Sequence, residues 1–129
     1  MLTPAIIREL PKRRARPEDA VQSAVVQHLK LRARPGVVFH SVPNEGKRSG
    51  READRLKKMG LTPGVNDLVI LLPPDGRYAG LELKDRKNGR HTEEQKCFGD
   101  AVIAAGGLYA VAWDIDEALD ILTEWGVFR

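Results

Sequence analysis

The stretch from Val65 to Lys84 constrains the fold of this chain more than any other part of the sequence. It reads VNDLVILLPPDGRYAGLELK, with an apolar run over residues 68–72 and a second strand-like run over residues 77–84. The residues between the two runs, 73–76, are Pro, Pro, Asp and Gly, which are typical of turns. The pattern predicts a β-hairpin with a short loop, and hence an antiparallel strand pair within the fold.

The hairpin also predicts which side chains face one another across its two strands. With this loop, Leu72 lies opposite Arg77 and, further from the loop, Asp67 lies opposite Glu82. Opposed Cβ atoms are roughly 4.5–5.5 Å apart, so two carboxylates in these positions destabilise a sheet unless a cation lies between them. Strand alternation places Lys84 on the same face as Glu82. One face of an apolar hairpin therefore carries Asp, Glu and Lys together.

These three side chains suit a divalent-metal site that acts on phosphodiester bonds. Mg²⁺ is usually held by one or two carboxylates together with waters and substrate phosphate, so Asp67 and Glu82 are its candidate ligands. Such a cation polarises the phosphodiester and activates water, while Lys84 holds the attacking water or offsets charge on the phosphate. An ordinary ion pair explains Glu-x-Lys when it is taken alone. The combination of an Asp, an apolar strand, a turn and Glu-x-Lys is far more specific.

The distribution of charge suggests a polyanionic partner. The 129 residues include 21 Lys and Arg against 18 Asp and Glu, but residues 101–129 hold one of the basic residues and five of the acidic ones. A basic body with an acidic end suits a nucleic acid on one side, although an ordinary charged surface is the alternative. The single cysteine excludes an internal disulfide and suits a cytoplasmic protein. The three histidines lack metal-ligand spacing, so no structural zinc site is expected. The sequence has no apolar run long enough to predict a membrane span.

The rest of the sequence predicts further elements around the hairpin, in the order helix, strand, short helix, hairpin, helix, strand and helix. The expected helices cover residues 17–33, 51–59, 92–105 and 115–125, and the expected strands outside the hairpin cover 37–42 and 108–113. This order predicts an α/β fold in which helices flank a mixed sheet of about four strands. We expect residues 1–16 to form a basic N-terminal arm and residues 17–129 to form one domain.

Two of the predicted helices carry polar residues that have both a functional and a structural interpretation. Glu18 lies on the same helical face as the apolar Val25 and Leu29, but a carboxylate in the first turn is also explained by the helix dipole. Thr92 and Gln95 form a capping box at the start of the later helix, which explains Gln95 without a catalytic role.

Basic side chains outside the hairpin are candidates for contact with phosphate, and a solvated surface is their alternative interpretation. They lie in the arm, in the polar loop and short helix before the hairpin, and in the loop after it. The predicted DNA-binding residues are Lys12, Arg13, Arg14, Lys47, Arg48, Arg51, Arg86 and Lys87. The few aromatic residues look buried rather than free for base stacking, which favours duplex or branched DNA over single strands.

In these motifs the chain resembles the PD-(D/E)XK nucleases and, within them, the VRR-NUC domain. The resemblance spans roughly Glu18 to Ala112 and rests on Glu18, PGVND at 63–67, LELK at 81–84 and TEEQ at 92–95. It implies a restriction-endonuclease-like α/β core. By this resemblance the metal ligands are Glu18, Asp67, Glu82 and the Leu83 carbonyl, and the catalytic residues are Asp67, Glu82, Lys84 and Gln95.

The expected function is that of a Mg²⁺-dependent endodeoxyribonuclease, with Mn²⁺ as a substitute metal, in a bacterial or phage-encoded protein. The resemblance associates it with branched DNA such as four-way junctions or flaps. A four-way junction needs two matched cuts, so we expect a homodimer, with residues 108–125 as its interface unless they complete the core. Two alternatives remain open: a DNA-binding accessory protein with an inert nuclease-like core, and a nuclease that acts on single strands or RNA.

Overall fold

A computed structural model describes residues 17–43 and 50–129. The predicted N-terminal arm lies outside the described residues, and so do Lys47 and Arg48 of the polar loop. The expected order of helices and strands is confirmed throughout the described part of the chain. The elements are α2 (Pro17–Arg32), β1 (Val38–Ser41), α3 (Gly50–Lys58), β2 (Leu68–Leu72), β3 (Arg77–Leu83), α4 (Glu93–Ala104), β4 (Leu108–Ala112) and α5 (Ile115–Glu124).

The strands form a mixed four-stranded sheet in the order β1-β2-β3-β4. Strand β2 pairs antiparallel with both β1 and β3, whereas β4 returns by way of α4 and pairs parallel to β3. Such a crossover needs a helix-sized connection, which α4 supplies. The expected α/β fold with a mixed sheet flanked by helices is therefore confirmed.

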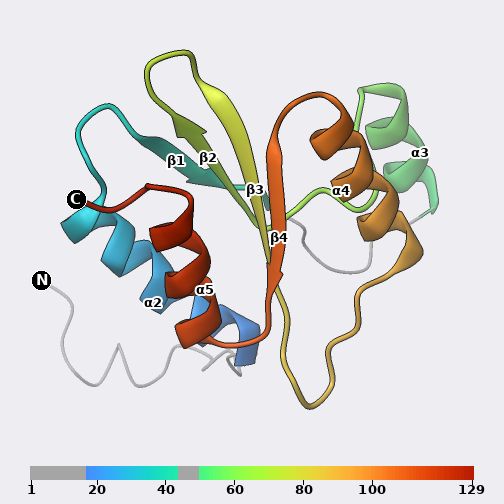
Figure 1. The fold of residues 1–129 in the computed structure, drawn as a ribbon. Helices are drawn as coiled ribbons and strands as arrows, with labels where there is room; N and C mark the ends of the chain where they lie inside the picture. The colour runs from blue at the N-terminus through green and yellow to red at the C-terminus, as the bar shows by residue number, and fades with distance from the viewer. Residues whose placement is uncertain (1–16, 44–49) are drawn as a thin grey trace, which may run out of the picture.

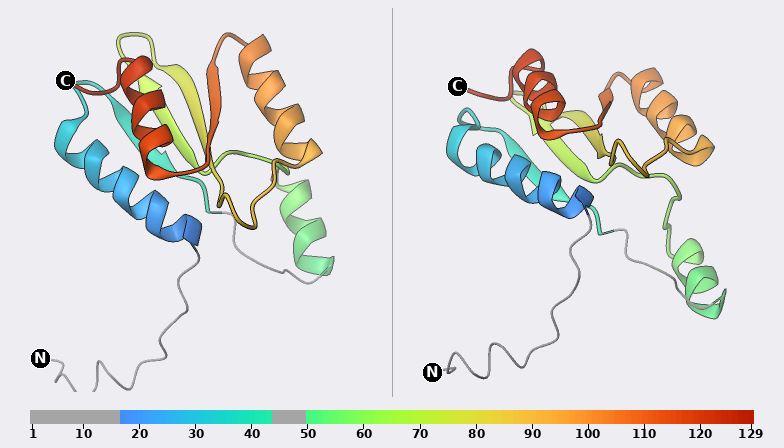
Figure 2. Two further views of the ribbon diagram at one scale, coloured as in Figure 1. Left: turned by 60° about the horizontal axis from the view of Figure 1, so that its bottom comes forward. Right: turned by 90° about the horizontal axis from the view of Figure 1, so that it is seen from below.

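Helices cover the two faces of the sheet unequally. Helices α2 and α5 lie together on one face, and α4 lies on the other face beside β3 and β4 (Figure 1). The short helix α3 stands away from the sheet (Figure 2), and none of its residues is buried. The α4 face of the sheet is thus left partly uncovered, and the candidate site lies on this face.

The hydrophobic core lies between the sheet and the α2–α5 pair. Strand alternation sends every second side chain of β2 and β3 into it, and one face of each helix completes it. Its fully buried members include Val25, Leu29, Leu68, Ile70, Leu81 and Leu122. The end of the chain closes the same layer, where Phe128 forms a β-bridge with Ala33 beyond the end of α2.

Part of the acidic C-terminal region completes this core. Ala118 and Leu122 of α5 are fully buried, and Trp125 packs against the core cluster. Other apolar residues of the region from 108 to 125 keep part of their surface exposed, Ile115 among them at 36%, so its role as a dimer interface stays a prediction. No helix in the described part of the chain is long and apolar enough to cross a membrane.

Candidate active site

The hairpin has the register that its turn residues predict. Leu72 pairs with Arg77 and Leu68 pairs with Leu81, so the prediction is confirmed along the whole of β2. Asp67 is the residue before β2 and therefore lies next to the end of β3 that carries Glu82. Its Oδ2 accepts a hydrogen bond from the backbone N–H of Leu83 at 2.7 Å. The Asp67 carboxylate is thus fixed against the neighbouring strand.

Close backbone packing holds the loop that leads into Asp67. Gly64 has a φ of +83°, and a Cβ at this position would clash with the carbonyl of Glu94 in the first turn of α4. Gly80 of β3 likewise leaves room for the side chain of Asn66, which a Cβ would overlap. These two glycines bring the loop, β3 and the start of α4 into contact.

Asn66 is fully buried beside Asp67, and both ends of its amide are hydrogen-bonded. Its Nδ2 donates to the carbonyl of Leu68 at 2.7 Å, and its Oδ1 accepts a hydrogen bond from the Tyr78 hydroxyl at 2.9 Å. The amide therefore locks the backbone on both sides of Asp67. Asn66 and Tyr78 were not predicted from the sequence as supports of the site, although a polar residue directly before Asp67 at the start of an apolar strand is a signal that points to Asn66.

Glu82 is a buried carboxylate at the centre of the site, with 3% of its surface exposed. Its Oε1 lies 3.6 Å from Lys84 Nζ and accepts a hydrogen bond from Gln95 Nε2 at 3.2 Å. Its Oε2 is also buried and has no hydrogen-bond partner within residues 17–43 and 50–129. A buried carboxyl oxygen without a donor is costly to ionise in a folded protein, so this atom is available to a proton or a cationic ligand.

Gln95 caps α4 and also contacts the buried carboxylate, while its catalytic role stays a prediction. Its backbone N–H donates to Thr92 Oγ1, while its side-chain Oε1 accepts from the backbone N–H of Thr92, which completes the capping box of α4. The other end of the same amide, Nε2, donates to Glu82. The helix cap thus aims an amide donor at the buried carboxylate.

The electrostatics of the site favour a proton or a cation at Glu82. Burial is the main factor that raises the pKa of Glu82, the nearby Asp67 charge adds to it and Lys84 opposes it; together they raise the pKa to about 8. At neutral pH the isolated site therefore does not hold two free carboxylates side by side.

A tyrosine and a histidine extend the site toward the start of α4. Tyr109 of β4 packs beneath α4 at Gly99, where a Cβ would clash with its ring, and its hydroxyl lies 3.0 Å from Nε2 of His91. Burial raises the pKa of Tyr109, and the charges of Glu82 and Asp67 add to the effect. Burial lowers the pKa of His91, and the positive charge of Lys84 adds to the effect. Neither residue was singled out from the sequence.

The structure does not bring Glu18 into the same cluster. Glu18 lies in the first turn of α2, half-buried, on the helical face that continues to the buried Val25 and Leu29. Within residues 17–43 and 50–129, no group of three or more His, Cys, Asp or Glu side chains is arranged to hold a metal ion. The roles predicted for Glu18 and for the Leu83 carbonyl as metal ligands therefore stay predictions.

The candidate DNA-binding residues in the described part differ in whether their side chains form ion pairs within the chain. Arg51 and Lys87 are exposed. Arg86 instead forms ion pairs with Asp114 at 3.1 Å and with Glu117 at 2.9 Å, which tie the loop after β3 to the start of α5. Its guanidinium is thus shared with two carboxylates of the same chain, and its contact with DNA stays a prediction.

The residues of this site fit a hard divalent cation. Asp67 and Glu82 provide adjacent carboxylate oxygens, and one of these, Glu82 Oε2, is buried without a donor. A cation there would satisfy that oxygen and offset the repulsion between the two carboxylates. Oxygen donors of this kind are the ones that Mg²⁺ and Mn²⁺ take in proteins.

Comparison with known proteins supports the fold. No protein-family model matches the sequence, and no curated protein matches it. Among solved structures, one described as "VRR_NUC domain protein" has a TM-score of 0.71 at 24% sequence identity, covering 91% of this chain and 94% of that chain. A second, described as "VRR_NUC domain", has a TM-score of 0.56 at 21% identity, covering 85% of this chain and 97% of that chain. The chain therefore has the fold of these domains along most of its length.

Proposed function

We propose, from the VRR_NUC fold of this chain, that the protein is a metal-dependent nuclease that hydrolyses phosphodiester bonds in DNA. One observation carries the proposal: Glu82 Oε2 is buried without a hydrogen-bond donor, beside a second carboxylate and a lysine. An inert core gains nothing from such an arrangement, because a buried oxygen without a donor and a carboxyl group that stays protonated above its ordinary pKa both destabilise the fold. This argues against a DNA-binding accessory protein.

Asp67 and Glu82 would hold the cation, which we take to be Mg²⁺ with Mn²⁺ as its substitute. When bound, such a cation supplies Lewis-acid polarisation of the phosphodiester and activation of water. Gln95 holds Glu82 in place through its Nε2 donor. Lys84, with its side chain 15% exposed, can reach from Glu82 toward a bound phosphate and offset the charge that develops there.

A cleavage assay with Lys84→Ala tests this assignment. Linear, flapped and four-way DNA are incubated with the protein in Mg²⁺, Mn²⁺ or chelator, and binding is measured separately in Ca²⁺. We expect cleavage only with Mg²⁺ or Mn²⁺, and a loss of about 100-fold or more in Lys84→Ala with little change in binding. Lys30→Ala is the matched control, because Lys30 is exposed on α2, away from the α4 face.

Cleavage in the presence of chelator would contradict the metal-dependent proposal. If binding falls in step with cleavage in Lys84→Ala, Lys84 acts as a clamp for phosphate rather than on the reaction. Crystals soaked in Mn²⁺ provide an independent test, since the ion should lie within bonding distance of both carboxylates.

We extend the proposal to branched DNA, such as junctions or flaps, and to a homodimer. Two matched cuts in a junction require two sites, which a symmetric dimer of a 14.3 kDa chain provides. The contact would involve the apolar residues of 108–125 that are not buried in the core, such as Ile115. Light scattering at micromolar concentration measures the mass directly. A monomeric mass together with equal cleavage of linear and four-way DNA would contradict both parts.

A further inference from the structure

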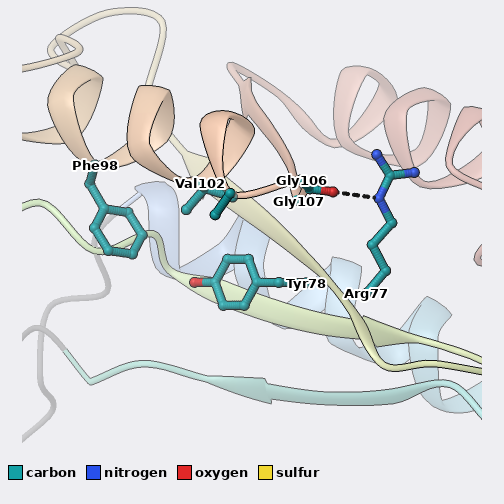
Figure 3. A pocket seen from close by; sticks show the side chains of 7 residues that line it. Arg77, Tyr78, Phe98, Val102, Gly106 and Gly107 are labelled. Atoms are coloured by element: carbon teal, nitrogen blue, oxygen red, sulfur yellow. Dashed lines mark hydrogen bonds between the residues drawn. The ribbon is translucent and has the colours of Figure 1, made fainter.

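A small cavity opens on the α4 face of the sheet, between the second half of α4 and the start of β3. It has a volume of about 260 Å³. Helix α4 contributes Phe98, Val102 and the residue that follows the helix, Ala105, while β3 contributes Arg77 and Tyr78. The rings of Tyr78 and Phe98 border the same space, and Arg77 stands at the other end (Figure 3). None of these residues belongs to the metal site proposed above.

The cavity and the carboxylate pair nevertheless lie along the same two elements. Tyr78 and Glu82 are on one face of β3, four residues apart, which is about 13 Å along a strand. On α4, Gln95 and Phe98 are three residues apart and point toward the same side. The hydrogen bond from Gln95 to Glu82 joins the two elements near the metal site. The bond from Arg77 Nε to the carbonyl of Gly106, 2.8 Å long, joins them at the far end.

The chemistry of the cavity suits a flat apolar ring with a negative charge nearby. The hydroxyl of Tyr78 already donates to Asn66, so this residue presents its ring to the cavity rather than a free polar atom. Phe98 and Val102 add apolar surface. Arg77 is exposed, and the two terminal nitrogens of its guanidinium have no partner among the described residues. A nucleobase with its phosphate combines these two properties.

We propose that this cavity binds an unpaired base of the nucleic acid on which the site acts, with Arg77 near its phosphate. The proposal rests on the nuclease function and specifies its substrate. At about 3.4 Å per stacked nucleotide, 13 Å places this base within about four nucleotides of the phosphate at Glu82. A base inside a duplex must be unpaired and unstacked before it can enter, at a cost of a few kcal/mol, so a substrate with a single-stranded part next to the cut fills the cavity at the lowest cost.

The experiment compares binding of three probes in Ca²⁺, where no cleavage is needed for a signal. The probes are a blunt duplex, the same duplex with a single-stranded flap, and that flap with abasic sites in its first four positions. We expect the wild type to bind the flap more tightly than the other two. Ala105→Trp, which fills the cavity from its exposed rim, should weaken binding of the flap by about 5-fold or more, because stacking on an aromatic ring contributes about 1–3 kcal/mol per base.

Ile103→Trp is the matched control, since Ile103 is 56% exposed on the same helix and does not line the cavity. Phe98→Leu provides a second variant that removes the ring without adding bulk, and melting curves establish that each variant is folded. In both cavity variants the affinity for the blunt duplex and for the abasic flap should stay unchanged.

Three results would overturn the proposal. The first is a flap affinity that Ala105→Trp leaves unchanged, and the second is an equal loss for all three probes. The third is a change of mass in the cavity variants, which would assign the cavity to contact between copies. Cleavage is measured separately. If the wild type cleaves DNA and the cavity variants bind the flap like the wild type, only the inference about the cavity is refuted. If the wild type binds the flap through the cavity but cleaves none of the probes, only the proposed nuclease function is refuted.

Discussion

Replacing Glu82 with Gln should change how the stability of the metal-free protein depends on pH. The raised pKa means that, between its ordinary value of 4.5 and about 8, folded Glu82 keeps a proton that the unfolded chain has released. A folded state that binds more protons loses stability as the pH rises. The contribution of Glu82 is therefore most favourable below pH 4.5 and declines until about pH 8.

The size of this effect follows from the same values. One pKa unit corresponds to about 1.36 kcal/mol, and most of the shift falls between pH 5 and 8, so the wild type should lose about 3 kcal/mol across this range through Glu82. For a chain of this size, about 3 kcal/mol corresponds to a decrease in melting temperature of about 10 °C. Glu82→Gln has nearly the same shape and can still accept from Gln95, but it cannot ionise.

The assay is thermal unfolding in chelator at a series of pH values from 5 to 9, followed by the same series in Mn²⁺. As the pH rises, the melting temperature of Glu82→Gln should increase relative to that of the wild type. Mn²⁺ should raise the melting temperature of the wild type, most of all at high pH, and leave the variant unchanged. Glu124→Gln, at an exposed position on α5, controls for the loss of one surface charge. Parallel profiles for wild type and Glu82→Gln would refute the reasoning.

Three further predictions concern other parts of the molecule. Gly80→Ala should destabilise the fold by about 1–3 kcal/mol, because its Cβ would overlap Asn66; Gly50→Ala, where the space is open, should have little effect in the same denaturant titration. Gln95→Glu keeps an acceptor for the helix cap but places a charge beside Glu82, so cleavage should fall by more than 10-fold with a smaller change in melting temperature. Replacing the basic residues of segment 1–16 with Ser should flatten the salt dependence of DNA binding by up to about 0.9 in slope per lost phosphate contact, and an unchanged slope would exclude the arm from binding.

The fold could be predicted from the sequence because its local signals agree with one another. Turn residues at 73–76 determined the hairpin register, which in turn placed Asp67 next to the strand of Glu82. The capping box identified the start of α4. Each of these signals depends on residues that are close in sequence. Such local preferences predict the final structure correctly when tertiary contacts do not oppose them.

The surroundings of the site could not be predicted, because they depend on contacts between distant segments. Asn66 meets Tyr78 across the hairpin, and His91 meets Tyr109 across a helix, with no periodic pattern to reveal either pair. The aromatic side chains were expected to be buried, yet Tyr78 and Phe98 line an open cavity. Arg86 looked like one more free basic residue, while its carboxylate partners lie about thirty positions further along the chain.

Helix α3 has a consequence for how proteins with this fold can diverge. Its residues, Gly50–Lys58, include no buried side chain, so the core does not depend on their identity. Substitutions at such positions usually change the free energy of unfolding by no more than about 0.5 kcal/mol. Selection can therefore alter the charge and shape of this helix independently of the residues that hold the sheet together. Proteins with the same core can therefore differ in the charge and shape of the surface at α3, while Asp67, Glu82 and their supporting contacts stay the same.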